Sequence, residues 1–341
     1  MSSRVLHVDV AKGLGIAFVV LGHNWITLHE KGELFRVIFS FHMPLFFFLS
    51  GLMFRPQQGW ASLLRSKAEA LLKPYALAAL IACALTAFSL WRLFWVVYGT
   101  GDKLPWVQLW FLPHLFLLFV FGKALLNATH FEARSPALRA VLLLAVLVAG
   151  YVLLPLFREV PLPWPRENGQ VVYAPGLPFC ADLVLVTGFY FIGGFALRER
   201  VLNWRQQPWL FVLALAVFAG LHAGLDVTMD LNERVYDRLI PVTLEAVTGI
   251  YLVIAVSAWL ARWPALGRAL AYLGTASLFV FIFHPFFQDH VYAWVDDHID
   301  DQDWLSVTLS FLAGLLLPLL LWELVRRNRL LARLWLPGKK A

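Results

Sequence analysis

The chain has 341 residues, of which 60% are apolar and only 15% are charged, and its mean hydropathy is +0.70. Soluble domains carry about 25% charged residues, so this composition excludes a soluble protein and predicts an integral membrane protein. The net charge of +6 needs no nucleic-acid partner, because the surplus of Lys and Arg lies in loops and in the C-terminal tail, where anionic membrane lipids attract it.

Apolar runs of about twenty residues mark the predicted membrane spans. We expect ten of them, forming an all-α polytopic helix bundle that is a single domain over residues 1–341. In chain order they cover residues 8–28, 35–54, 71–91, 107–126, 138–157, 178–198, 208–228, 238–261, 269–290 and 304–325.

The distribution of basic residues predicts the orientation of these spans. An even number of spans puts both termini on one side. If that side is the cytoplasm, the inner segments hold nineteen Lys and Arg and the outer segments hold eight, with Lys12 set apart inside the first span. Acidic residues gather in the outer loop 289–303. The charges therefore predict an N-in, C-in protein of the cytoplasmic (inner) membrane, and the first apolar run lacks a cleavage site, so we expect it to remain as an anchor.

The first predicted span contains three ionisable residues, Asp9, Lys12 and His23. At about 100° per residue, His23 returns to within roughly 20° of the direction of Lys12 and within roughly 40° of Asp9. Because a charge at the bilayer centre costs at least about 2.5–3.5 kcal/mol, we expect this polar face to contact water or partners inside the bundle. The simpler alternative is an ion pair between Asp9 and Lys12, with His23 as a hydrogen-bonded core residue.

Other polar side chains are predicted at the depth of His23, which lies roughly 22 Å along its helix and past the midplane. Together they favour a water-filled cavity that opens outward, although a single histidine in such a place is more often structural than catalytic. The residues of this set are His42, His114, Asp182, His222, Glu245 and His284.

A second group of candidates is basic and lies on the predicted cytoplasmic side. Lys12 is in the first turns of its helix. The loop between the second and third spans adds Arg55, Arg65, Lys67 and Lys73. Such a cluster suits a phosphorylated ligand, although the positive-inside rule alone also accounts for most of it. No phosphate-binding glycine loop, HExxH metal motif or GxSxG elbow occurs, so ATP hydrolysis, zinc hydrolysis and a serine triad have no support.

Several segments in chain order carry a family resemblance. They read DVAKGLGIAFVVLGH at 9–23, FHMPLFFFLSG at 41–51, LRSKAEALLKPY at 64–75, LWFLPHLF at 109–116 and LGTASLFVFIFHPFF at 273–287. The most specific element is a basic residue, ten intervening positions and a histidine, here Lys12 and His23. In these features the chain resembles the integral-membrane acyltransferase family 3, particularly its fucose 4-O-acetylase-like members.

The resemblance implies an O-acyltransferase of the cell envelope. Members of the family transfer acetyl, and sometimes succinyl or another short acyl group, from cytoplasmic acyl-CoA to a hydroxyl of a cell-surface polysaccharide or lipid-linked sugar. His23 would be the base, and no metal would take part. The expected CoA-binding residues are Lys12, Arg65, Lys67 and Lys73. The expected substrate-binding or orienting residues are Asp9, His42, Trp110, His114, Asp182, Glu245 and His284. The chain departs from the family at Ala70, where a second basic residue often follows the one at Lys67, and a homo-oligomer is one possible assembly.

The residues and the resemblance predict the same chemistry. A neutral histidine in a partly desolvated pocket can take the proton of a sugar hydroxyl as the hydroxyl attacks a thioester. Asp9 lies roughly 21 Å from His23 along the helix, so we expect the orienting partner to come from another span, from Glu245, Asp182 or His284. The alternative function is a proton-coupled transporter or flippase of a glycan precursor, which an outward cavity with a titrating histidine would also suit. The internal repeat of many transporters is not evident in the sequence.

Overall fold

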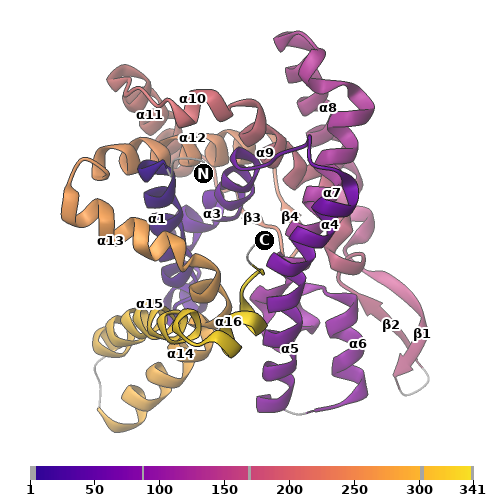
Figure 1. The fold of residues 1–341 in the computed structure, drawn as a ribbon, viewed down its shortest axis with the longest axis vertical. Helices are drawn as coiled ribbons and strands as arrows, with labels where there is room; N and C mark the ends of the chain where they lie inside the picture. Colours follow the sequence, from indigo (N-terminus) through magenta and orange to yellow (C-terminus); the bar gives the residue numbers. More distant parts are fainter. Residues whose placement is uncertain (1–4, 87, 168–169, 300–302, 339–341) are drawn as a thin grey trace. The chain divides into compact units, whose positions relative to one another are not determined.

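The computed structural model describes residues 5–86, 88–167, 170–299 and 303–338. The chain forms two compact units, each assembled from separate stretches of sequence. The first unit comprises Met1–Leu49, Leu197–Met229 and Asp237–Asn328, and the second comprises Ser50–Ala196, Asp230–Tyr236 and Arg329–Ala341. Helices dominate the described residues (Figure 1), which confirms the expected all-α class.

The first unit contains four of the five histidines that the sequence predicts at a similar depth, namely His23, His42, His222 and His284. Its helices are α1 (Leu6–Gly22), α2 (Trp25–Glu30), α3 (Glu33–Leu52, whose last three residues belong to the second unit), α10 (Arg198–Leu202), α11 (Pro208–Gly224), α12 (Leu239–Leu260), α13 (Pro264–Thr275), α14 (Ser277–His298) and α15 (Asp303–Arg327). α13 and α14 meet at a bend of 79°, and α14 and α15 pack against each other.

Two glycines allow α1 and α13 to pack with their backbones in contact. A Cβ atom at Gly13 would overlap the carbonyl oxygen of Leu270, and a Cβ atom at Gly274 would overlap that of Asp9. Small residues at a crossing of membrane helices permit this close approach. Gly13 directly follows Lys12, so the tight crossing holds the polar face of α1 at a defined position in the first unit.

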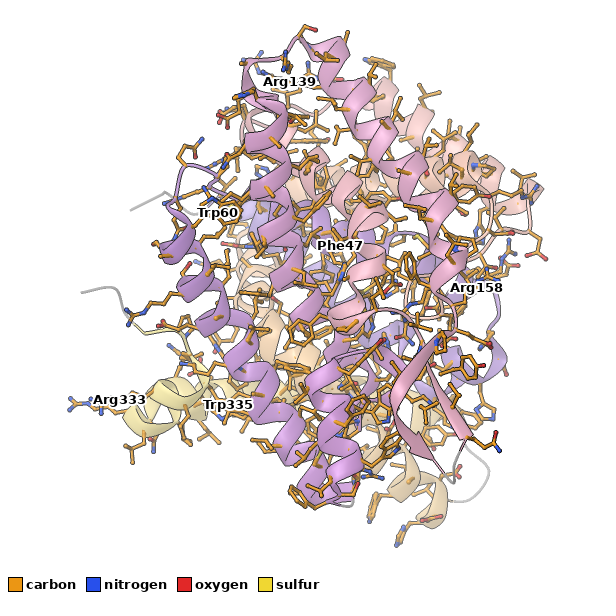
Figure 2. The ribbon with its side chains drawn as sticks, turned by 90° about the vertical axis from the view of Figure 1, so that its right-hand side faces the viewer. Phe47, Trp60, Arg139, Arg158, Arg333 and Trp335 are labelled. Atoms are coloured by element: carbon orange, nitrogen blue, oxygen red, sulfur yellow. The ribbon has the colours of Figure 1, made fainter. Side chains whose placement is uncertain are left out.

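In the second unit α7 packs against α4 and α9, and a hairpin packs against α6. The elements of this unit are α4 (Trp60–Lys67), the π-helical turn η1 (Ala68–Leu72), α5 (Lys73–Thr86), α6 (Leu90–Tyr98), the 3₁₀ turns η2 (Gly101–Lys103) and η3 (Val107–Trp110), α7 (Phe111–Thr129), η4 (Phe131–Ala133), α8 (Pro136–Leu153), η5 (Leu154–Phe157), η6 (Pro178–Leu183), α9 (Val184–Ala196) and α16 (Arg329–Trp335). α16 packs against α5 through its end, which carries Trp335 (Figure 2).

A two-stranded hairpin interrupts the helical architecture that the sequence predicts. The antiparallel strands β1 (Val160–Glu167) and β2 (Gln170–Ala174) pack on Trp95 of α6 through Leu162 and Val172. Two shorter strands, β3 (Met229–Asp230) and β4 (Val235–Tyr236), form a second small sheet.

The described helices fit a multi-pass membrane protein. Seven of them, and also the bent pair α13–α14, are long and apolar enough to cross a membrane, and these eight correspond to eight of the ten predicted spans. The other two predicted spans fall on α1 and α11, which have 17 residues each and extend about 25 Å, less than the roughly 30 Å of a hydrocarbon core. The ten-span count therefore stays a prediction.

The structure corrects the prediction for residues 55–91. A continuous helical segment runs from Trp60 to Thr86, so Arg65 and Lys67 lie on a helix and not in a loop. Gly59 precedes this helix with extended backbone angles, and Trp60 is its first residue (Figure 2). Apolar runs do not predict the start of this helix, because its first turns carry Ser, Arg and Lys.

Candidate active site

His23 stands at a break in the helix that the sequence predicts to be continuous over residues 8–28. α1 ends at Gly22, His23 is its C-cap, and α2 begins at Trp25. The break coincides with Asn24, which is fully buried and whose Nδ2 donates hydrogen bonds to the Val307 carbonyl at 3.1 Å and to Ser310 Oγ at 3.0 Å. These bonds to α15 hold Asn24 in an extended conformation that a continuous helix cannot adopt.

The imidazole of His23 is oriented by its own helix. Its Nδ1 donates a hydrogen bond to the carbonyl oxygen of Val19 at 2.9 Å. A carbonyl oxygen only accepts hydrogen bonds, so in the neutral ring the proton is on Nδ1 and Nε2 is the basic atom. The expectation that another span orients His23 is thus not met at Nδ1.

Two further histidines of the first unit surround His23. The centroid of the His284 ring lies 5.3 Å and that of the His42 ring 6.3 Å from the His23 ring. Both are buried, and both direct Nδ1 at backbone carbonyls of their own helices, as His23 does. Among the described residues no group of three or more His, Cys, Asp or Glu is placed to hold a metal ion.

Lys12 and Asp9 form the ion pair that the sequence allows as an alternative. Lys12 Nζ lies 3.3 Å from Asp9 Oδ1, and the two side chains are 28% and 15% exposed. The pair leaves part of Lys12 accessible. Lys12 is eleven residues before His23, which corresponds to roughly 16 Å along the helix.

The three other predicted CoA-binding cations lie in the second unit and have partners there. Lys67 is half-buried, and its Nζ lies 3.5 Å from the centroid of the Phe119 ring, a cation–π contact. Arg65 is exposed and pairs with Glu69 at 3.2 Å. Lys73 donates hydrogen bonds to the carbonyls of Arg333 and Leu336 at the end of α16, at 3.1 and 2.5 Å.

Two acidic residues that the sequence places near His23 have other partners. Asp182, in the second unit, accepts hydrogen bonds from Arg234 Nε at 3.0 Å and from the Leu177 backbone N–H at 2.8 Å. Burial by itself lowers the pKa of Arg234, but the neighbouring Cys180 and Asp182 outweigh burial and raise it. This buried pair joins η6 to the segment that carries Arg234 in the second unit.

Glu245 belongs to a separate polar group of the first unit. His222 Nδ1 lies 2.8 Å from Glu245 Oε1, and His222 Nε2 lies 2.7 Å from Glu33 Oε2. Arg36 also pairs with Glu33 at 2.8 Å. These contacts connect α3, α11 and α12.

His114 and Trp110 lie together in the second unit. His114 is fully buried, its Nε2 lies 2.9 Å from Thr187 Oγ1, and the centroid of its ring lies 5.7 Å from that of Trp110. Trp110 is buried as well. The two residues connect η3 and α7 with α9.

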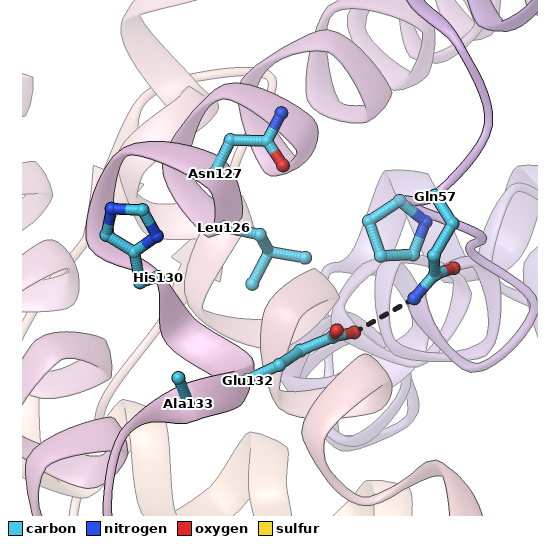
Figure 3. Close-up of a pocket in the computed structure, with 7 residues that line it drawn as sticks. Gln57, Leu126, Asn127, His130, Glu132 and Ala133 are labelled. Atoms are coloured by element: carbon cyan, nitrogen blue, oxygen red, sulfur yellow. Dashed lines mark hydrogen bonds between the residues drawn. The ribbon is translucent and has the colours of Figure 1, made fainter.

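The second unit also has a pocket of about 390 Å³. Its lining residues are Pro56, Gln57, Leu126, Asn127, His130, Glu132 and Ala133. Figure 3 shows the side chain of Gln57 reaching Glu132 on the other wall, with a hydrogen bond of 3.2 Å. None of the site residues predicted from the sequence lines this pocket.

Comparison with known proteins establishes the family. Residues 5–323 match the family model of the acyltransferase domain Acyl_transf_3. The chain belongs to acyltransferase family 3. This confirms the resemblance carried by the Lys12 and His23 spacing, and with its many apolar helices the protein is a multi-pass membrane acyltransferase. No curated protein and no solved structure matches the chain.

Two buried polar residues of this acyltransferase, Lys123 and Gln288, are not among the site residues predicted from the sequence. Lys123, only 5% exposed, donates hydrogen bonds from Nζ to the carbonyls of Pro56 and Gln58 at 2.6 and 2.7 Å. A charged residue within an apolar helix is itself an indication of a polar site, for Lys123 as for Lys12. Gln288, buried beside the histidine cluster, gave no signal, because an uncharged amide hardly changes the hydropathy of a span.

Proposed function

We propose that this acyltransferase moves an acetyl or another short acyl group from acyl-CoA to a hydroxyl group of a cell-surface polysaccharide or lipid-linked sugar. The observation that carries the proposal is the geometry of His23. Its Nδ1 donates to the Val19 carbonyl at 2.9 Å, so the neutral ring has Nε2 as a base in a cluster of buried side chains. The family supplies the reaction class.

The reaction needs one base and no covalent intermediate on the protein. His23 Nε2 takes the proton of the acceptor hydroxyl while its oxygen attacks the thioester carbonyl carbon. A tetrahedral intermediate forms and collapses, the C–S bond breaks, and the CoA sulfur takes the proton back from the imidazolium. The Val19 carbonyl holds the ring in place throughout and stabilises the charged form, because it continues to accept from Nδ1.

We assign binding of the CoA phosphates first to Lys12 and Lys67. Each carries a charge at the end of a flexible side chain, and Lys12 is partly exposed beside Asp9. Arg65 and Lys73 are secondary candidates, because Arg65 is paired with Glu69 and Lys73 binds the end of α16. A pantetheine arm could cover the roughly 16 Å from Lys12 to His23 along α1.

We further propose ten spans with both termini in the cytoplasm, in the cytoplasmic membrane. The support is the excess of Lys and Arg in the segments that this orientation puts inside. In this orientation Lys12 faces the cytoplasmic pool of acyl-CoA and His23 lies beyond the midplane, so the acceptor can reach it from the outside.

The test is transfer of labelled acetyl from acetyl-CoA by the purified protein in detergent. Wild type should release CoA thiol and label a hydroxyl acceptor from a panel of glycosides. His23→Ala should lower kcat by about 10²–10⁴, the usual contribution of a general base, with unchanged thermal unfolding. His298→Ala is the control, because exposed His298 also directs Nδ1 at its own helix, 2.8 Å from the Trp294 carbonyl. Full activity of His23→Ala would refute the base, and no transfer by wild type would refute the reaction.

A further inference from the structure

His284 lies directly before Pro285 in α14, and its ring contacts a backbone carbonyl for which Pro285 cannot supply the helical N–H donor. Pro285 has no backbone N–H, so the Phe281 carbonyl four residues earlier lacks its usual helical donor. His284 Nδ1 lies 2.9 Å from that oxygen and 3.0 Å from the Val280 carbonyl. Nδ1 therefore donates, and Nε2 of the neutral ring is an acceptor. This Nε2 is buried and has no hydrogen-bond partner among the residues that the structure describes.

Gln288, one turn further along α14, presents a second acceptor of the same kind. It is 2% exposed, and its Nε2 donates to the carbonyl of Val20 at 2.9 Å. That carbonyl is available because α1 ends at Gly22, and Asn24 N–H turns to the Leu21 carbonyl instead. The amide is thereby oriented, and its Oε1 is buried with no hydrogen-bond partner in the described part of the chain.

The two acceptors share one face of α14 next to the base. Residues four apart in a helix have Cβ atoms about 5–6 Å from each other. The His284 ring lies 5.3 Å from the His23 ring, and Gln288 binds the backbone three residues before His23. Buried acceptors without donors are unfavourable, so the complementary ligand supplies N–H or O–H donors, and hydroxyl groups are the donors that the proposed reaction brings to His23. Carboxylates and phosphates have acceptor oxygens only and do not fit.

We infer that His284 Nε2 and Gln288 Oε1 accept hydrogen bonds from the hydroxyl groups that neighbour the one being acylated. The acceptor substrate is then a polyol, such as a sugar ring with free adjacent hydroxyls, and not an isolated alcohol. This inference rests on the proposed function, which brings a hydroxyl to His23. In this arrangement His23 takes the proton of the reacting hydroxyl, and His284 and Gln288 select the acceptor.

The experiment compares methyl hexopyranosides with their single-deoxy derivatives at saturating acetyl-CoA. For wild type, removal of a hydroxyl next to the acylated one should lower kcat/KM about tenfold to hundredfold, the effect of leaving a buried acceptor unpaired. His284→Phe keeps a ring but removes the acceptor, so it should lose rate on the parent glycoside and discriminate little between parent and deoxy compound. His290→Phe, an exposed histidine of the same helix that also binds its own backbone, should discriminate as wild type does.

A binding measurement without donor separates recognition from chemistry. The parent glycoside should raise the melting temperature of wild type and of His290→Phe, and should have a smaller effect on His284→Phe. Gln288→Met is the second variant if His284→Phe fails to fold, and it should lose discrimination at one hydroxyl.

The outcomes distinguish the two proposals. If wild type acetylates no glycoside, the proposed function fails. If wild type acetylates the parent and every deoxy derivative equally well, the inference fails and the proposed function stands. The same holds if both His284→Phe and Gln288→Met lower all rates by one common factor.

Discussion

Replacing Lys12 by Gln distinguishes between two roles of this residue, the ion pair with Asp9 and binding of the CoA phosphates. Its Nζ lies 3.3 Å from Asp9 Oδ1, whereas strong charge-assisted hydrogen bonds measure about 2.7–2.9 Å. The pair is therefore longer than a strong charge-assisted bond, and its side chains keep 28% and 15% of their surface exposed. A charged hydrogen bond to a CoA phosphate contributes about 1.5–3 kcal/mol, which is about 10–150-fold in affinity. The larger effect should therefore fall on donor binding.

The assay is acetyl transfer over a range of acetyl-CoA concentrations. Lys12→Gln should raise the apparent KM for acetyl-CoA about 10–150-fold and change kcat little, since the lost contact stabilises ground state and transition state alike. Asp9→Asn should leave this KM unchanged or lower it, because it releases Lys12 from its pair. Lys12→Arg keeps the charge and is the matched control. Added salt should weaken donor binding more in wild type than in Lys12→Gln.

The opposite signs expected for the two variants make the test decisive. If Lys12→Gln binds CoA with unchanged affinity, and if it and Asp9→Asn lower the melting temperature by the same amount, then Lys12 serves the ion pair and the donor-binding role is wrong. A fall of kcat at saturating donor in Lys12→Gln would instead place Lys12 in the chemical step, contrary to its distance from His23.

Three further outcomes are expected. Gly13→Ala should destabilise the protein by about 1–3 kcal/mol, the usual cost of overpacking, because its Cβ meets the α13 backbone; an unchanged thermal melt would contradict the tight crossing. Lys123→Met should cost about 1–3 kcal/mol for each of the two carbonyls that it leaves unpaired, measured by thermal unfolding in detergent. An impermeant thiol reagent on intact cells should label Asp297→Cys and spare Arg329→Cys, and labelling of the latter would refute the cytoplasmic C-terminus.

Matched controls accompany these variants. Gly32→Ala should be neutral, because a Cβ there meets nothing within 4 Å. Arg65→Met should cost at most about 0.5 kcal/mol, because its pair with Glu69 is on the surface of a helix. Unsubstituted protein should stay unlabelled, since both native cysteines are buried.

The sequence alone was sufficient for the class of the protein, for its family and for part of its candidate site. Apolar runs and the spacing of Lys12 and His23 are local signals, which depend on residues close together in the chain. Depth along predicted spans also grouped His42 and His284 with His23, and the structure places their rings 6.3 and 5.3 Å from it.

The tertiary structure decided which polar groups pair. Depth gives the height of a side chain in the membrane but not the neighbour that its helix face meets, so it could not show that Asp182 pairs with Arg234 or that Glu245 pairs with His222. Nor could it show that α1 ends just before His23, because the bonds of Asn24 go to α15, more than 280 residues later. These contacts arise from packing between distant segments, for which a single sequence holds no local signal.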